Sequence, residues 1–192
     1  NVEIINNERF NYKSAHRCEL AAHLESIDKN YDRHYNSYLE SVSKKLKICS
    51  PRKTTKIDKF YEEDERIWNK VVEHTTDKIC LEVGPGYVGE TIFWWWVRER
   101  IVIDPLIDKY IEALKKRNSI CWYDNIKTYN TYAEDLIEEL VDSIDGAIVC
   151  RNTLDHTIDP LGILTNIAKY AKKGCYLLLW SDLYHSNEGG HR

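Results

Sequence analysis

The residues of this chain whose types and spacing could do chemistry lie in a glycine-rich turn and at a carboxylate that follows it. The turn, residues 84–89, reads GPGYVG and comes directly after an apolar, strand-like run. Glycine lets the backbone turn sharply and approach a ligand closely, because it has no Cβ. Asp104 lies 20 residues after Gly84, where a carboxylate can accept both hydroxyls of an adenosine ribose. The pair predicts a ligand that contains adenosine; the alternative is a tight turn that binds nothing.

Glu82 distinguishes between the kinds of adenosine ligand. It stands two residues before Gly84. In a dinucleotide site a helix N-terminus faces the pyrophosphate, and a carboxylate beside two phosphate charges would be repelled. A ligand with an ammonium group and a sulfonium would tolerate the carboxylate. We therefore expect S-adenosylmethionine, and the alternative is that Glu82 only caps backbone amides of the turn.

Short apolar runs alternate with helical patterns from residue 78 onward, and these elements must position the turn and the carboxylate. We expect strands at residues 78–83, 100–103, 126–132, 146–150 and 175–180, and helices at residues 88–98, 108–117, 134–141 and 160–170. The glycine turn would open the first of these helices, and Asp159 and Pro160 suit the N-cap and first position of the last. Near-continuous apolar strands between helices predict an α/β fold, a three-layer Rossmann-like sandwich with a mostly parallel central sheet. Ligands of such sheets bind beyond the carboxyl ends of the strands.

The first part of the chain is interpreted as an N-terminal helical extension, residues 1–76, ahead of a core domain at residues 77–192. Its clearest element is a helix at residues 58–74. One face of this helix carries Phe60, Ile67 and Val71, with Trp68 and Val72 beside them. A second helical spacing relates Tyr31, Tyr35 and Tyr38. These tyrosines form either a packing face, which we favour, or a lid over the ligand pocket.

The composition and net charge limit the classes of binding partner and the cellular compartment that we expect. The net charge of -4 and the pI near 6.0 give no global attraction to nucleic acid or to an anionic membrane. The longest apolar run, at residues 88–97, is interrupted by Glu90 and is far shorter than the roughly 20 residues that span a bilayer. No signal peptide is visible, and the six cysteines form no CxxC pair. We expect a cytoplasmic protein with reduced thiols and a small-molecule substrate; the oligomeric state is left open, a homodimer included.

These residues, together with three further segments, resemble the class I S-adenosylmethionine-dependent methyltransferases over residues 78–180. Residues 82–86 (EVGPG) resemble the first motif of that family, and residues 103–106 (IDPL) resemble its second. Residues 133–136 (AEDL) are similar to the segment after the third strand. Residues 146–156, followed by Asp159 and Pro160, resemble the fourth strand and the loop beside the reacting methyl, and residues 172–179 are like the turn and fifth strand. Their order and spacing along the chain make the resemblance specific.

The resemblance implies how these residues hold S-adenosylmethionine. The glycine backbone and the Glu82 carboxylate would surround the methionine part, Asp104 would bind the ribose, and Glu134 or Asp135 would accept the adenine amino group. The residues expected to bind the cofactor are Glu82, Gly84, Pro85, Gly86, Tyr87, Asp104, Pro105, Leu106, Glu134, Asp135, Arg151 and Asn152. The family fold normally ends with a sixth strand and an antiparallel seventh, and we expect these last strands to be missing here.

His156 is the candidate catalytic base, because it lies on the loop after the fourth strand and can titrate near neutrality. Methyl transfer from a sulfonium mainly requires alignment and exclusion of water, and a base matters most when the acceptor is a hydroxyl. Asp155 would orient the ring or bind substrate. The alternative, which we slightly favour, is that His156 only hydrogen-bonds its loop.

Other polar and aromatic residues receive structural interpretations. No metal site is expected, because the C-terminal residues Asp182, His185 and His191 fit no ligand spacing, and with Tyr184 they are interpreted as a polar tail. Among Trp94, Trp95 and Trp96 at least one should pack on the sheet, which we favour over an aromatic box for a cationic ligand.

The leading prediction is an S-adenosylmethionine-dependent methyltransferase that acts on oxygen, nitrogen or carbon of a small molecule. An RNA or protein methyltransferase would use the basic segment at residues 44–59, but the low pI and the acidic run at residues 62–65 argue against it. An NAD(P)-dependent oxidoreductase would bind a nicotinamide cofactor instead. A catalytically silent module would bind cofactor weakly or not at all.

Overall fold

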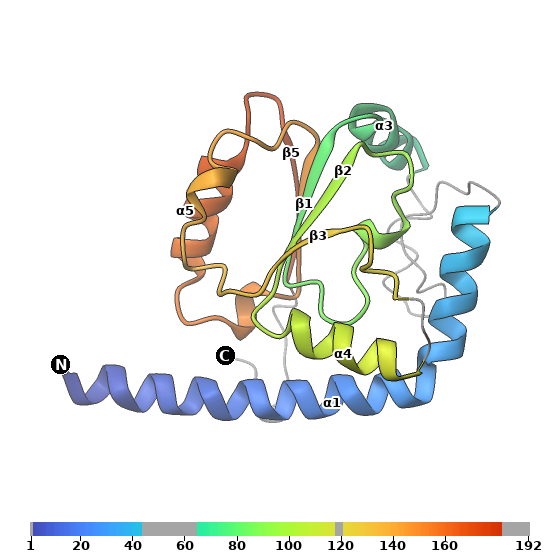
Figure 1. The fold of residues 1–192 in the computed structure, drawn as a ribbon. Helices are drawn as coiled ribbons and strands as arrows, with labels where there is room; N and C mark the ends of the chain where they lie inside the picture. The colour runs from blue at the N-terminus through green and yellow to red at the C-terminus, as the bar shows by residue number, and fades with distance from the viewer. Residues whose placement is uncertain (1, 44–64, 118–120, 182–192) are drawn as a thin grey trace.

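Five parallel strands form the central sheet of the computed structural model, which describes residues 2–43, 65–117 and 121–181 (Figure 1). The strands are β1 (Ile79–Val83), β2 (Glu99–Ile103), β3 (Lys127–Tyr129), β4 (Ala147–Arg151) and β5 (Tyr176–Trp180). Their order across the sheet is β3-β2-β1-β4-β5, with every pair parallel. All five predicted strands are present, and the α/β fold class is confirmed.

The central strands are buried on both faces because their side chains are almost all apolar. Leu81 of β1 is paired with Ile101 of β2 on one side and with Ile148 of β4 on the other, and all three side chains are buried. Alternate side chains of one strand enter different cores: Cys80 packs in one and Leu81 in the other. This double burial is typical of a parallel sheet that is covered on both faces.

Helices on both sides of the sheet complete three layers (Figure 1). The first core is shared by α1 (Val2–Ser43), α3 (Glu65–Thr75) and α4 (Ile107–Arg117), and the second core lies under α5 (Pro160–Tyr170). The helices predicted at residues 108–117 and 160–170 are confirmed. Asp159 caps α5, since its carboxylate accepts a hydrogen bond of 2.9 Å from the amide of Gly162.

The buried face of α3 differs from the predicted one. Val71 and Val72 are buried, and Trp68 packs against them in the same core. Ile67, predicted to share the buried face, is 53% exposed. The prediction was wrong at Ile67, because the neighbouring Trp68 is the side chain that packs edge to face on Trp94 and Trp96, with centroids 5.8 and 6.0 Å apart. The start of the predicted helix, Phe60 included, lies outside the described residues.

No α-helix follows the glycine turn, which corrects the helix predicted at residues 88–98. The segment is irregular apart from a single 3-10 turn, η1 (Thr91–Phe93). Trp94 and Trp96 are both buried and stack on each other with ring centroids 5.7 Å apart. Side chains two positions apart point in different directions on an α-helix. Packing of the two indoles therefore excludes the helix that the sequence pattern indicated.

The helix predicted at residues 134–141 is also absent, apart from the 3-10 turn η2 (Glu138–Leu140). Backbone groups that a helix would use internally are bonded to α5 instead. Asn166 donates to the carbonyls of Ala133 and Glu134 at 3.0 and 2.9 Å, and the amide of Ile137 donates to the hydroxyl of Tyr170 at 2.9 Å. Tertiary contacts have replaced the local helical bonds.

The long helix α1 runs beside α4 and packs its aromatic residues into the first core (Figure 1). Tyr31 is buried and stacks on Trp122 with centroids 5.5 Å apart, and Tyr38 meets Phe93 edge to face. The N-terminal tyrosines thus form a packing face here. Within the described part of the chain, no helix has the length and apolar character needed to cross a membrane. The division into an extension and a core at residue 76 stays a prediction.

Candidate functional site

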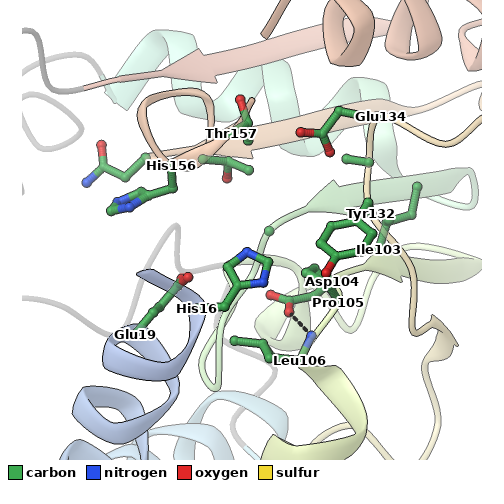
Figure 2. Close-up of a pocket in the computed structure, with 14 residues that line it drawn as sticks. His16, Glu19, Ile103, Asp104, Pro105, Leu106, Tyr132, Glu134, His156 and Thr157 are labelled. Carbon is green, nitrogen blue, oxygen red and sulfur yellow. Dashed lines mark hydrogen bonds between the residues drawn. The ribbon is translucent and has the colours of Figure 1, made fainter. Parts of the chain in front are cut away.

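A cleft lies at the carboxyl ends of the strands, where open α/β sheets bind their ligands (Figure 2). Each of the first four strands is followed by residues that line it: Gly84 after β1, Asp104 after β2, Glu134 after β3 and Asn152 after β4. Because β1 lies between β2 and β4, the chain order reverses direction at this point of the sheet. The cleft encloses about 480 Å³, its open mouth included.

Two other segments approach the glycine turn so closely that positions 84 and 86 require glycine. Gly84 has a φ of +66° and Gly86 a φ of +62°, the left-handed region that glycine favours. A Cβ on Gly84 would lie 2.4 Å from Oγ1 of Thr153, and a Cβ on Gly86 would lie 2.7 Å from Cε1 of His23. The loop after β4 and helix α1 therefore approach the turn more closely than another residue type would allow.

Glu82 is buried beneath the turn and is not part of the cleft lining. Its carboxylate accepts hydrogen bonds from the amide of Glu90 at 2.7 Å and from the amide and hydroxyl of Thr91 at 2.9 and 2.7 Å. Burial raises the pKa of Glu82, while these three bonds lower it. The carboxylate thus caps amides of the segment that follows the turn, the alternative stated for it from the sequence. Its contact with the methionine part of a cofactor stays a prediction.

Asp104 lies at the tip of β2 with its carboxylate held at the edge of the cleft (Figure 2). Its Oδ1 accepts from the amide of Leu106 at 2.8 Å, and its Oδ2 accepts from the amide of Gly86 at 3.1 Å. Burial raises the pKa of Asp104 to about 6, although the two amide bonds lower it. Each carboxylate oxygen keeps a further lone pair, so this group can also accept hydrogen bonds from a ligand.

The structure separates the two carboxylates that the sequence could not distinguish. Glu134 lines the cleft, and its Oε1 is 3.3 Å from the donating amide of Ile158. Asp135 is not part of the lining, and its carboxylate accepts from the hydroxyl of Thr131 at 3.4 Å. Of these two carboxylates, Glu134 is therefore the one that lines this cleft.

His156 belongs to the cleft and lies in the 3-10 turn η3 (Leu154–His156). Its amide donates to the carbonyl of Thr153 at 3.0 Å, which fixes the turn. Nε2 of His156 is 3.4 Å from Oδ2 of Asp155, so the carboxylate can orient the ring. The catalytic role of His156 stays a prediction.

Seven cleft residues were not predicted as site residues. They are His16 and Glu19 on α1, and Ile103, Tyr132, Ala133, Thr153 and Thr157 at the strand ends and in the loops that follow. Figure 2 shows His16, Glu19 and Tyr132 among them. The rings of His16 and Tyr132 stack with centroids 5.6 Å apart and an angle of 13° between their planes. Burial lowers the pKa of His16, and the nearby His156 lowers it further. The only signal in the sequence was the helical spacing of positions 16 and 19, which places them on one face but does not say what that face covers.

Seven of the predicted site residues line the cleft and six do not. Those in the lining are Gly84, Asp104, Pro105, Leu106, Glu134, Asn152 and His156. Those outside it are Glu82, Pro85, Gly86, Tyr87, Asp135 and Arg151. Arg151 forms an ion pair with Glu90, and the hydroxyl of Tyr87 lies 2.6 Å from Oγ of Ser26 on α1. The basic segment 44–59 and the tail with Tyr184, His185 and His191 lie outside the described residues.

Comparisons with known proteins show that some solved structures are similar to part of this chain. No protein-family model matches it, and no curated protein matches it. Among solved structures, it is similar to the YcgJ protein of Bacillus subtilis, with 20% identity and a TM-score of 0.45 over 58% of this chain and 47% of that one. It is also similar to a SAM dependent methyltransferase from Aquifex aeolicus, with 15% identity and a TM-score of 0.48 over 71% and 78% of the two chains.

A third likeness is to the trans-methyltransferase CalH in complex with SAH, with 18% identity and a TM-score of 0.45 over 89% of this chain and 52% of that one. The chain spans less than half the length of the YcgJ protein. By its own topology, this chain is a Rossmann-like α/β protein with a ligand cleft at the switch point of its sheet.

Proposed function

We propose that this chain is the cofactor-binding part of an S-adenosylmethionine-dependent methyltransferase that acts on a small molecule. The observation that carries the proposal is that the amides after the glycine turn are already occupied. A dinucleotide site presents the free amides of a helix N-terminus to the pyrophosphate. Here the described segment 84–98 contains no α-helix, and Glu82 accepts from the amides of Glu90 and Thr91. The turn therefore suits an adenosine ligand without phosphates.

The cleft residues fit the adenosine part of this cofactor. Asp104 offers a carboxylate to the two ribose hydroxyls, and the apolar side chains of Ile103 and Leu106 can flank a flat base. Glu134 would accept the adenine amino group in preference to Asp135, because Glu134 lines the cleft and Asp135 does not. Pro105 lies in the same stretch of the lining. These assignments agree with what the resemblance implies for residues 103–106.

The loop after β4 would face the reacting end of the cofactor. When bound, the cofactor supplies a methyl group that a positively charged sulfur has already activated. Asn152 would help to position it, and the chain then has to align the acceptor and keep water out. His156, oriented by Asp155, would take the proton that the acceptor loses.

Calorimetric titrations with S-adenosylhomocysteine and, separately, with NADH test the proposal. We expect S-adenosylhomocysteine to bind and NADH not to bind; the opposite pattern would refute the proposal and favour an oxidoreductase. Asp104→Ala should weaken S-adenosylhomocysteine binding by about tenfold or more, because a buried acceptor is lost. Asp108→Ala is the matched control, since Asp108 is an exposed aspartate on the adjacent α4 and is not part of the cleft.

A further inference from the structure

The cleft has two ends with different chemistry (Figure 2). Asp104 and Glu134 mark the adenosine end of the proposed function. Glu19 from α1 and His156 from η3 both lie on the other side, and His16 stands between them and the first group. We call Glu19, His16 and His156 the acceptor end. The cofactor assignments above use neither side chain from α1.

The acceptor end is built from segments that are far apart in the sequence but are both held firmly. α1 is anchored by Tyr31, which is buried against Trp122, and by His34, which is also buried. η3 is anchored by the bond from the His156 amide to Thr153, whose hydroxyl donates to the carbonyl of Val83 at 3.0 Å. Both walls of the acceptor end therefore have a defined position relative to the glycine turn.

The charges of the cleft favour a cation over an anion. Its charged side chains are Glu19, Asp104 and Glu134, and none of its lining residues in the described part of the chain is Lys or Arg. An acceptor that carries a carboxylate or phosphate would meet three carboxylates and no partner of opposite charge. An ammonium group would meet Glu19, whose side chain is 33% exposed and whose Oε1 lies 3.8 Å from Nε2 of His23 on the same helix.

The two imidazoles supply acceptors for hydrogen bonds and for a proton. Burial and the neighbouring His156 lower the pKa of His16, which makes its ring a weaker base that can still accept a hydrogen bond from a ligand N–H. Removal of a proton falls to His156, whose Nε2 lies 3.4 Å from Oδ2 of Asp155. Within the described ranges, no three His, Cys, Asp or Glu side chains are arranged to hold a metal ion.

We propose that the methyl acceptor is an amine, whose ammonium form is recognised by Glu19 and whose nitrogen loses a proton to His156. This inference rests on the proposed function. The ammonium gives one proton to the neutral imidazole, which becomes cationic. The freed lone pair of the nitrogen then attacks the methyl carbon, so that a C–N bond forms while the C–S bond breaks and its electron pair stays on sulfur. The positive charge of the sulfonium passes to the methylated nitrogen, which again faces Glu19.

Ligand binding without turnover tests this inference. Protein saturated with S-adenosylhomocysteine is titrated with benzylamine, benzyl alcohol and benzoate, which share a ring and differ in the polar group. We expect benzylamine to bind at least tenfold more tightly than the other two. Glu19→Gln should weaken benzylamine binding by about tenfold, because a charged hydrogen bond is lost, and should leave S-adenosylhomocysteine binding unchanged. Glu25→Gln is the matched control, because Glu25 is an exposed glutamate on the same helix outside the cleft.

A charge reversal provides the second variant. Glu19→Lys should make benzoate the tighter ligand if Glu19 sets the preference. The inference is overturned if benzylamine does not bind, if benzoate binds to the unmodified protein as tightly as benzylamine, or if Glu19→Gln leaves benzylamine affinity unchanged. Failure of S-adenosylhomocysteine to bind in the first step would instead refute the proposed function, so the two failures are distinguishable.

Discussion

On the face of the sheet covered by α1, α3 and α4 the core is rich in aromatic residues, whereas on the face covered by α5 it is largely aliphatic. The aromatic core contains Phe93, Trp94, Trp96, Tyr110, Trp122 and Tyr123, all buried. The aliphatic core contains Leu81, Ile103, Ile148, Ile163 and Ile167, together with Tyr170. Both cores fill a similar place between helix and sheet.

The two cores differ in how they hold the cleft. From the aromatic core, the indole of Trp122 donates to the carbonyl of Tyr87 at 2.7 Å, and the hydroxyl of Tyr123 donates to the carbonyl of Gly86 at 2.8 Å. These bonds fix the glycine turn directly. From the α5 side, Asn166 and Tyr170 reach the loop that carries Glu134, through the bonds described above. Large side chains with one polar atom can thus pack a core and also fix a backbone turn.

Trp94→Ala should have the largest effect, since it removes a fully buried indole from the aromatic core. We expect the free energy of unfolding to fall by about 3–5 kcal/mol, measured by chemical denaturation. Trp94→Phe is the control and should cost much less, because the buried indole N–H has no hydrogen-bond partner among the described residues. Equal losses in the two variants would show that the ring volume is not what stabilises this core.

Ile163→Ala should have the next largest effect, in the aliphatic core under α5. The side chain is fully buried, so the free energy of unfolding should fall by about 2–4 kcal/mol. Because Ile163 makes no polar contact with the cleft loops, the affinity of the folded protein for S-adenosylhomocysteine should not change. If the free energy of binding fell by as much as the free energy of unfolding, the two cores would not differ in how they support the cleft.

The pH dependence of stability and of cofactor binding tests the role of Asp104, whose carboxylate joins the glycine turn to the end of β2. Burial raises the pKa of its carboxyl to about 6, so in the folded protein it gains a proton more readily than in the unfolded chain. Its contribution to stability is therefore present at low pH and is lost as the pH rises through about 6. Ribose hydroxyls need the ionised acceptor, so S-adenosylhomocysteine affinity should fall about tenfold between about pH 7 and about pH 5.

Calorimetric titration at a series of pH values measures this change. Asp104→Asn is the control and should bind weakly with little dependence on pH over the same range. A wild-type affinity that stays constant down to about pH 5 would contradict the role assigned to Asp104.

Tyr87→Phe should have the smallest effect, at the contact between the turn and α1. The hydroxyl lies 2.6 Å from Oγ of Ser26 and 3.3 Å from Nε2 of His34. Its removal should lower the free energy of unfolding by about 0.5–1.5 kcal/mol, the net contribution of one hydrogen bond. Hydrogen exchange should localise the loss to α1; uniform loss over the sheet would mean that this bond does not dock the helix.

The strands and two helices were predictable because their signals are local. Apolar runs such as residues 79–83 and 147–151 can be buried only inside a covered sheet, and Asp159 with Pro160 marks the start of α5. The two helices predicted at residues 88–98 and 134–141 do not form, because contacts with distant parts of the fold replace their internal hydrogen bonds. The carboxylate of Glu82 and the indoles of Trp94 and Trp96 override helical propensity in the first, and Asn166 and Tyr170 override it in the second.

By itself, the sequence determined the α/β class, the glycine turn and the placement of Asp104 at a strand end, because period, turn chemistry and chain order specify these locally. Only the tertiary structure decided that Glu134 rather than Asp135 faces the cleft and that His16 and Glu19 of α1 form its wall. No pattern within α1 specifies which surface it covers. That choice follows from burial of Ile27 and Tyr31 against side chains more than fifty positions away, an interaction that exists only once the sheet has formed.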